Sequence, residues 1–153
     1  MEKIKIRTAT TDDLETLLEF EQGVISAERP FDATLKDGHI HYYDLQAMIS
    51  ADHIELLVAE ADGMIVASGY ARIEESQLFY RNPQYAYLGF MYVRPAYRGM
   101  GINKKIIEAL RSWALSKNIH ELRLDVYFNN LSAISAYKKI GFSSVMIQMR
   151  LGL

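Results

Sequence analysis

The segment from Val93 to Lys105 holds the residues whose types and spacing are best suited to chemistry. It contains two closely spaced glycines, four cations and no acid. Its sequence is Val93-Arg94-Pro95-Ala96-Tyr97-Arg98-Gly99-Met100-Gly101-Ile102-Asn103-Lys104-Lys105. Glycines let the backbone approach a ligand closely, and free N–H groups at a helix start attract anions. Four cations in a chain whose net charge is −2 therefore predict a local anion site, which suits a polyphosphate. A glycine turn with solvated basic neighbours is the alternative interpretation.

Two common phosphate-binding motifs do not fit this segment. A Walker loop requires Gly-x-x-x-x-Gly-Lys-Ser/Thr, and the chain contains no such run. The dinucleotide fingerprint requires a third glycine where Lys104 stands, and it belongs in the first strand–helix unit of a chain. Magnesium-nucleotide hydrolysis and dinucleotide binding are therefore not expected.

A strand is expected before this segment and a helix after it. Residues 85–93 are apolar or aromatic on both alternating faces, which is typical of a central strand covered on both sides. Apolar positions from Ile102 to Ala114 recur at helical intervals, and Lys117-Asn118 provides a C-terminal stop. The elements expected downstream are a strand over 122–126, a helix over 131–140 that ends at Gly141, and a last strand over 145–151.

Upstream of the segment, two local signals are specific. Thr10 with Asp13 three residues later predicts a capping box that opens a helix ending near Gly23 or slightly beyond, and Asp62-Gly63 predicts a tight hairpin. The other elements expected there are a strand over 3–7, a loop or a loop around a short helix over 28–43, a short helix capped by Asp44, and hairpin strands over 54–60 and 64–73. This order predicts a mixed α/β sheet with helices on its faces.

Composition limits the class of protein. With 153 residues, 50% of them hydrophobic, we expect one domain over residues 1–153. The absence of cysteine excludes disulfides, thiolate metal sites and a cysteine nucleophile. The near-neutral charge, from 17 basic and 19 acidic residues, argues against a broad nucleic-acid surface. No apolar run has the length of a membrane span or a signal peptide, so we expect no membrane partner and a cytoplasmic location.

Two motifs together resemble those of a known family. Val93-x-Pro95-x-x-Arg98-Gly99-x-Gly101-Ile102 resembles the coenzyme A pyrophosphate loop of the GNAT-type N-acetyltransferases. Asn130-x-x-Ala133-Ile134-x-x-Tyr137-x-Lys139-x-Gly141-Phe142 is similar to the family's second characteristic stretch, at the expected distance downstream. The order of elements agrees over almost the whole chain, although residues 22–53 match no motif. The resemblance implies the GNAT fold, with a mixed, mostly antiparallel central sheet and helices on both faces.

The resemblance also implies a set of site residues. Acetyl-CoA would be the cosubstrate, without a metal, and Tyr137 would be the general acid that protonates the departing thiolate. The alternative for Tyr137 is a core residue, and the alternative for Asn130 is a helix N-cap. Where family members usually have glycine or alanine, this chain has Asn103, which adds bulk beside the phosphates. The implied cofactor-binding residues are Met91, Tyr92 and Val93 for the pantetheine arm, Arg98, Gly99, Met100, Gly101, Ile102, Asn103 and Lys104 for the pyrophosphate, and Asn130 with Ala133 beside the pantetheine arm.

The general base is not assigned by the motifs. Many family members have a carboxylate on the strand corresponding to 85–93, and this chain has none there. Candidates are Glu21, Glu74, Glu75 and Asp125, each with a solvated surface acid as the alternative, or water relayed by Tyr85 or Tyr87. By resemblance, the segment that covers the acceptor cleft carries acids that either attract a cationic amine or form a solvated face, namely Glu28, Asp32, Asp37 and Asp44. A metal site at His39-x-His41 is disfavoured because no third ligand is in register.

The resulting hypothesis is an N-acetyltransferase that moves acetyl from acetyl-CoA to a primary amine by direct attack in a ternary complex, since no cysteine is present to form an acetyl-enzyme. The expected partner is a small-molecule or peptide amine, with no nucleic acid. The sequence leaves the oligomeric state open between a monomer and a homodimer, and pairing is common in the family. Two alternatives are a non-catalytic acyl-CoA-binding sensor and an unrelated anion-binding interaction domain.

Overall fold

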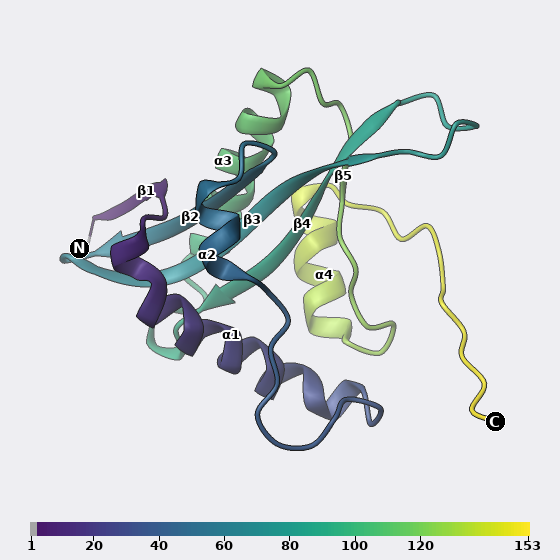
Figure 1. The fold of residues 1–153 in the computed structure, drawn as a ribbon, viewed down its shortest axis with the longest axis horizontal. Coiled ribbons are helices and arrows are strands. Elements are labelled where there is room, and N and C mark those ends of the chain that lie inside the picture. The colour runs from purple at the N-terminus through teal and green to yellow at the C-terminus, as the bar shows by residue number, and fades with distance from the viewer. Residues whose placement is uncertain (1–2) are drawn as a thin grey trace.

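The computed structural model describes residues 3–153 and contains one five-stranded sheet (Figure 1). The strand order is β1-β2-β3-β4-β5. The first four strands pair antiparallel, whereas β4 and β5 are parallel. The strands are β1 (Ile4–Thr8), β2 (Ile54–Ala61), β3 (Met64–Glu75), β4 (Gln84–Val93) and β5 (Leu122–Arg123). The expected mixed, mostly antiparallel sheet is therefore confirmed.

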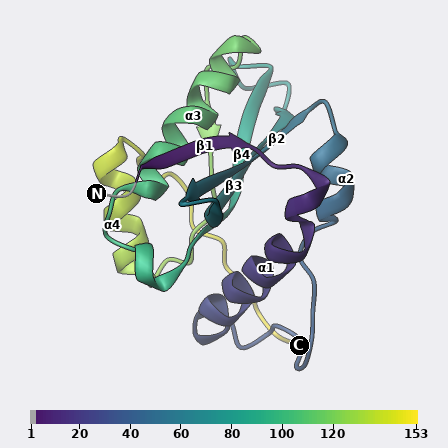
Figure 2. The same ribbon diagram turned by 90° about the vertical axis from the view of Figure 1, so that its left-hand side faces the viewer.

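Helices cover both faces of the sheet. Figure 2 shows α1 and α2 on one side and α3 and α4 on the other. Each side has its own apolar core, one centred on Phe20 and Leu56 and the other on Ile106 and Leu110. The α-helices are α1 (Leu14–Glu28), α2 (Leu45–Ser50), α3 (Ile102–Ser116) and α4 (Leu131–Ile140), with short 3-10 turns at Thr11–Asp13, Arg29–Phe31 and Pro95–Tyr97. None of the helices within residues 3–153 combines the length and the apolar character that crossing a bilayer requires.

Several element boundaries are set by single residues, as the sequence predicts. The turn between β2 and β3 places Asp62 and Gly63 at positive φ, 52° and 77°, as a tight hairpin requires. The Oδ1 atom of Asp44 accepts a hydrogen bond of 3.2 Å from the N–H of Ala47 and caps α2. The left-handed backbone of Gly141 ends α4.

Three expectations about element lengths are wrong. Helix α1 continues to Glu28 because Gly23 serves close packing and not chain termination. A Cβ atom at Gly23 would lie 2.5 Å from Cε2 of Tyr92, so only glycine lets the helix approach β4 this closely. Strand β5 contains only Leu122–Arg123, where five residues were expected. Residues 145–151 form no strand, because no neighbouring strand pairs with them.

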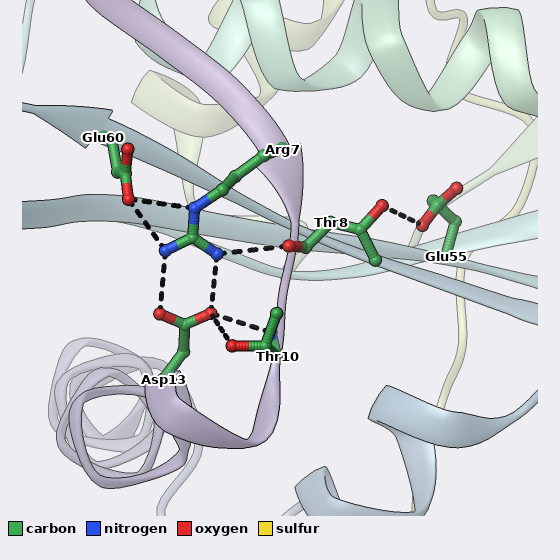
Figure 3. Close-up of polar contacts among 6 residues, drawn as sticks. All are labelled: Arg7, Thr8, Thr10, Asp13, Glu55 and Glu60. Atoms are coloured by element: carbon green, nitrogen blue, oxygen red, sulfur yellow. Dashed lines mark hydrogen bonds and ion pairs between the residues drawn. The ribbon is translucent and has the colours of Figure 1, made fainter.

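A charged cluster fixes β1 to the start of α1 (Figure 3). Arg7 donates two hydrogen bonds to the carboxylate of Asp13, at 2.7 and 2.9 Å, and its Nε donates to Oε1 of Glu60 at 2.9 Å. Oδ2 of Asp13 also accepts from the N–H of Thr10 at 2.8 Å, which completes the predicted capping box. The hydrogen bonds from Arg7 hold the pKa of Asp13 below its usual range.

Substitution Asp13→Asn tests this cluster. We expect it to lower the free energy of unfolding by about 1.5–3 kcal/mol at pH 7, because a charged hydrogen-bonding partner of Arg7 is lost. The pKa of Asp13 is lowered by folding, so its stabilisation is present above the unfolded pKa of about 3.9 and is lost as pH falls through the folded value. Urea unfolding should therefore show the difference shrinking below about pH 4. Asp12→Asn, at the exposed neighbouring acid, should have little effect. An equal deficit at pH 3 and pH 7 would contradict the ionic origin.

Candidate active site

The glycine loop lies between the end of β4 and the first turn of α3. Gly99 and Gly101 have φ angles of 78° and 77°, a region that favours glycine, and a Cβ atom at either would meet no atom within 4 Å. The first N–H of α3 that finds a helical acceptor is that of Lys105, which donates to the carbonyl oxygen of Gly101 at 3.2 Å. In the described part of the chain, no backbone carbonyl accepts from the N–H groups of residues 102–104. These donors, at the positive end of the helix dipole, suit an anion.

The four cations around the loop divide into two kinds. Nε of Arg98 donates to the carbonyl oxygen of Val93 at 3.0 Å, and Nε of Arg94 donates to that of Ile65 at 3.1 Å. Their guanidinium groups also lie over the rings of Tyr92 and Phe20, at 5.9 and 5.0 Å. Lys104 and Lys105 are exposed in the first turn of α3. Two positions of positive charge are therefore fixed and two are free to adjust to a ligand.

Asn103 is accommodated in the second position of α3 with one polar atom unsatisfied. Its Oδ1 atom is buried and lacks a hydrogen-bond partner within the described residues. An unpaired buried acceptor costs on the order of 1–3 kcal/mol. Rotation of the amide by half a turn would place Nδ2, a donor, at the same position. The departure from glycine or alanine therefore adds a polar group, as well as bulk, at the start of α3.

Strands β4 and β5 separate soon after they meet. They pair only at Ala86 with Leu122 and at Tyr87 with Arg123, whereas β4 continues to Val93. The hydroxyl of Tyr87 donates to Oδ2 of Asp125 at 3.2 Å across the point of separation. Beyond it, the backbone of β4 that faces β5 has no strand partner in the described part of the chain. Met91, Tyr92 and Val93 lie in this stretch, next to the glycine loop, and Tyr92 and Val93 pair with β3 on the opposite side.

A β-bulge bends β4 within the same stretch. Phe90 has a φ of 56°, which is unusual for a residue other than glycine, and the register of β3 shifts opposite it. The hydroxyl of Ser68 donates to the carbonyl oxygen of Phe90 at 2.9 Å in the interior. The buried ring of Phe90 packs 4.9 Å from the ring of Tyr43. The core therefore imposes the bulge and redirects the unpaired backbone of β4.

Helix α4 carries the second motif. Oδ1 of Asn130 accepts from the N–H of Ala133 at 3.3 Å, so Asn130 is an N-cap, with Nδ2 not involved in this bond. Tyr137 is half-buried and packs against the α3 side of the sheet, with its ring in a T-shaped contact with Phe142. Burial and, secondarily, the charge of Glu28 raise the pKa of Tyr137. Tyr137 therefore stays protonated over a wide pH range, as a general acid must.

Glu28, the last residue of α1, is the acid whose charge reaches Tyr137. Burial is the main cause of a raised pKa at three other tyrosines, Tyr42, Tyr43 and Tyr127, and the charge of Glu28 raises these pKa values further. The pKa of Tyr127 is raised to about 12. The buried hydroxyl of Tyr42 has no hydrogen bond of normal geometry within the described residues, although Glu28 lies close enough to act on it electrostatically. Tyr42 and Tyr43 lie in the loop before α2, Tyr127 lies in the loop after β5 and Tyr137 lies in α4, and the charge of Glu28 acts on all four. Sequence reasoning named Glu28 but missed Tyr42 and Tyr127, for which no spacing gives a signal.

The other acids of the 28–44 segment have different roles. Asp32 accepts from the hydroxyl of Tyr127 at 2.9 Å and from the N–H of Thr34 at 3.0 Å, and Arg150 lies 3.1 Å away. Hydrogen bonds from Thr34, then from Tyr127 and Arg150, hold its pKa well below the usual range. Asp44 caps α2 and Asp37 is exposed. Of the four acids of this segment, Asp32 forms an ion pair within the described residues, whereas Glu28, Asp37 and Asp44 form none.

The four proposed bases are all engaged by neighbours. Glu21 is wholly buried, which contradicts a surface position: it accepts from the N–H groups of Tyr42 and Tyr43 at 3.0 and 2.9 Å and lies 2.6 Å from Nδ1 of His41. Glu21 therefore fixes the 37–44 loop to α1. The remaining three are bound as follows: Glu74 to Arg72, Glu75 to Gln84, and Asp125 to Tyr87. Within residues 3–153, no group of three or more potential metal ligands occurs.

Comparisons with known proteins agree with this geometry. Residues 17–142 match the model of the Acetyltransferase (GNAT) family. The chain is 26% identical over 114 residues to an aminoglycoside N(6')-acetyltransferase type 1 from Salmonella typhimurium, which covers 74% of each chain. It is 46% identical over 55 residues to a thialysine N-epsilon-acetyltransferase from Bos taurus, which covers 36% of this chain and 32% of the relative.

The fold also matches solved structures. A predicted acetyltransferase from Clostridium acetobutylicum, crystallised with acetyl-CoA, superposes with a TM-score of 0.77 at 20% identity, covering 98% of this chain and 96% of the other. At this level of identity the likeness shows the fold, while the family match over residues 17–142 rests on the sequence itself. The chain belongs to the GNAT family of acetyltransferases.

Proposed function

We propose that this chain transfers the acetyl group of acetyl-CoA to a primary amine. One observation carries the proposal: the N–H donors of residues 102–104 and the surrounding cations follow the end of β4, the strand that separates from β5 after Tyr87. An acyl-CoA has two parts that match these features: a diphosphate, which the loop would hold, and an extended pantetheine arm, which would lie along β4. Amine acceptors named for the relatives, an aminoglycoside and thialysine, support the choice of an amine.

The cofactor would be held mainly by the backbone. The N–H groups from Gly99 to Lys104, with Arg98, would bind the diphosphate, since helix starts and left-handed glycines direct donors to one point. The backbone of residues 91–93 on the side away from β3 would bind the pantetheine arm, and Nδ2 of Asn130 would add a donor. We propose no metal, because the thioester is already activated for attack by an amine.

The amine would bind at Glu28, the carboxylate whose charge acts on Tyr42, Tyr43, Tyr127 and Tyr137. A primary amine with a pKa near 10.4 is protonated at neutral pH, so a carboxylate both attracts it and offers a route for its proton. The neutral nitrogen then attacks the thioester carbon, and N–H groups at the end of β4 stabilise the oxygen of the tetrahedral intermediate. As the C–S bond breaks, the CoA thiolate takes the proton of Tyr137, and the nitrogen of the intermediate releases its extra proton, which restores the hydroxyl of Tyr137. The products are the acetylated amine and free CoA.

Acetylation of an amine panel, followed by thiol release and by mass detection of the product, tests the proposal. We expect CoA to raise the melting temperature of the protein. We also expect at least one amine to give a product about 42 Da heavier than itself, because an acetyl group replaces one hydrogen. Binding of CoA without thiol release for any amine would favour the acyl-CoA sensor. The absence of any CoA-dependent thermal shift would favour the interaction domain and contradict the proposal.

Two glycine variants make the binding test specific. Gly101→Ala and Gly63→Ala each place a side chain at a φ of 77° where no atom lies within 4 Å. Both should cost similar stability, about 1–2 kcal/mol, because the backbone strain is the same. Only Gly101→Ala should weaken CoA binding, since Gly63 lies in the β2–β3 turn. Equal CoA affinity for both variants would remove the loop from the site.

A further inference from the structure

Three side chains join α1 to the loop before α2 and take no part in the chemistry proposed above. His39 and His41 are exposed in the loop, and Glu21 of α1 is wholly buried. Nδ1 of His41 lies 2.6 Å from Oε1 of Glu21, and Nε2 of His41 lies 3.2 Å from Nε2 of His39. Two imidazole nitrogens therefore face each other at the surface, and a buried carboxylate lies behind one of the rings.

The carboxylate of Glu21 sets the orientation and the tautomer of His41. Its Oε2 atom accepts hydrogen bonds from the N–H groups of Tyr42 and Tyr43, at 3.0 and 2.9 Å. These bonds stop the carboxylate from turning away from the ring. An ionised carboxylate only accepts, so Nδ1 of His41 carries a hydrogen and Nε2 presents a lone pair. The exposed ring of His39 presents the lone pair of its own Nε2 when its hydrogen is on Nδ1, where water accepts it.

Two lone pairs that face each other at this distance need a cation between them. A proton meets the need when one ring donates to the other, and a metal ion meets it by binding both nitrogens. Zinc binds imidazole nitrogen at about 2.0–2.1 Å, so two nitrogens of a tetrahedral shell lie about 3.3–3.4 Å apart. Ligands at about 90°, as in a square-planar Cu(II) site, would lie about 2.8–3.0 Å apart. The observed 3.2 Å is closer to the tetrahedral separation. The ring planes meet at 80° with centroids 4.7 Å apart, which is an angled and not an end-to-end approach.

We propose that His39 and His41 bind a zinc ion through their Nε2 atoms, with Glu21 as the outer partner that orients His41. Histidines that bind metals usually donate their other ring N–H to a carboxylate or a carbonyl, which fixes the ring and makes it a better ligand. No group of three or more potential ligands occurs within residues 3–153, so water or a ligand from solution would complete the tetrahedral shell. The sequence pattern argues against a metal because it contains no third ligand, and it does not reveal the buried carboxylate. The site shares no residue with the glycine loop and does not depend on the function proposed above.

Zinc titration of the full chain, without an affinity tag, freed of metal by a chelator and in the absence of CoA, tests the site. We expect one zinc ion per chain and a melting temperature that rises with zinc concentration, because an ion that binds only the folded chain stabilises it. His39→Ala and His41→Ala should each abolish this rise, since a single imidazole remains. Because His39 is exposed, its substitution should not disturb the fold. His53→Ala and His120→Ala, at the two other histidines, both exposed, are the matched controls and should leave zinc binding unchanged.

Two further measurements examine the carboxylate and the ligands directly. Glu21→Gln removes the negative charge behind His41 and should lower the zinc affinity by about 10- to 100-fold, the usual effect of losing an outer partner. X-ray absorption of the zinc complex should show two imidazole nitrogens at about 2.0–2.1 Å, with oxygen in the remaining positions. The absence of zinc binding by the unmodified chain, or binding that persists in both His39→Ala and His41→Ala, would overturn the site. A zinc complex whose spectrum shows fewer than two imidazoles would do the same.

Discussion

Substitution Tyr137→Phe is expected to lower kcat by about 100-fold or more, because positioned acids typically contribute 10²–10⁴-fold to such reactions. The variant keeps the ring that contacts Phe142 and the core on the α3 side, and it removes only the hydroxyl. The dissociation constant of acetyl-CoA should therefore stay within about twofold, since a one-group change outside the loop leaves the loop contacts in place. Steady-state kinetics with a competent amine, together with CoA titration, measure both quantities.

The pH profile gives this prediction a second readout. Burial, then the charge of Glu28, raises the pKa of Tyr137, so the protonated acid persists to higher pH than an ordinary tyrosine would allow. The rate of the unmodified protein should show no loss from deprotonation of Tyr137 below about pH 10, the ordinary value. Tyr80→Phe, at a partly exposed tyrosine of the β3–β4 loop, is the matched control and should change neither kcat nor affinity. Unchanged turnover in Tyr137→Phe would assign that residue to the core alone.

The parts of the fold that could be predicted from sequence are those decided by one residue and its immediate neighbours. Asp62-Gly63 adopts positive φ whatever surrounds it, Asp44 caps the helix that follows it, and Gly141 ends α4. The glycine loop belongs to the same class, because the first N–H groups of any helix lack internal acceptors.

Features that depend on a distant partner could not be predicted in this way. Gly23 has the sequence signature of a helix stop, yet its lack of a side chain serves contact with Tyr92, about seventy residues away. The alternation of residues 145–151 predicts a strand, but a strand also needs a neighbour, and none of the strands in the described residues pairs with this segment. The effect of the Glu28 charge on the pKa values of Tyr42 and Tyr127 likewise joins residues that share no period or motif. Glu21 is the converse case, since nothing local indicates that an acid in α1 is wholly buried.

Substitution Glu28→Gln is expected to reduce kcat/KM for the amine by about 30- to 150-fold, the equivalent of the 2–3 kcal/mol that a charge-assisted hydrogen bond supplies. Glutamine keeps the shape and a hydrogen-bonding oxygen but neither attracts an ammonium ion nor accepts its proton. The KM for acetyl-CoA should not change, because the loop that would hold the cofactor lies at the start of α3 and Glu28 at the end of α1. Initial rates over a matrix of both substrates separate the two effects.

Tyrosine titration separates an electrostatic role of Glu28 from a structural one. The charge of Glu28 contributes to the raised pKa of Tyr42, Tyr43, Tyr127 and Tyr137, so its removal should lower all four and move tyrosinate absorbance to lower pH. Asp37→Asn removes an exposed acid from the neighbouring loop and should leave both the titration and kcat/KM nearly unchanged. If Glu28→Gln shifts the tyrosine titration but leaves kcat/KM for the amine intact, the carboxylate tunes the tyrosines without binding the acceptor, and the amine must find its charge partner and base elsewhere.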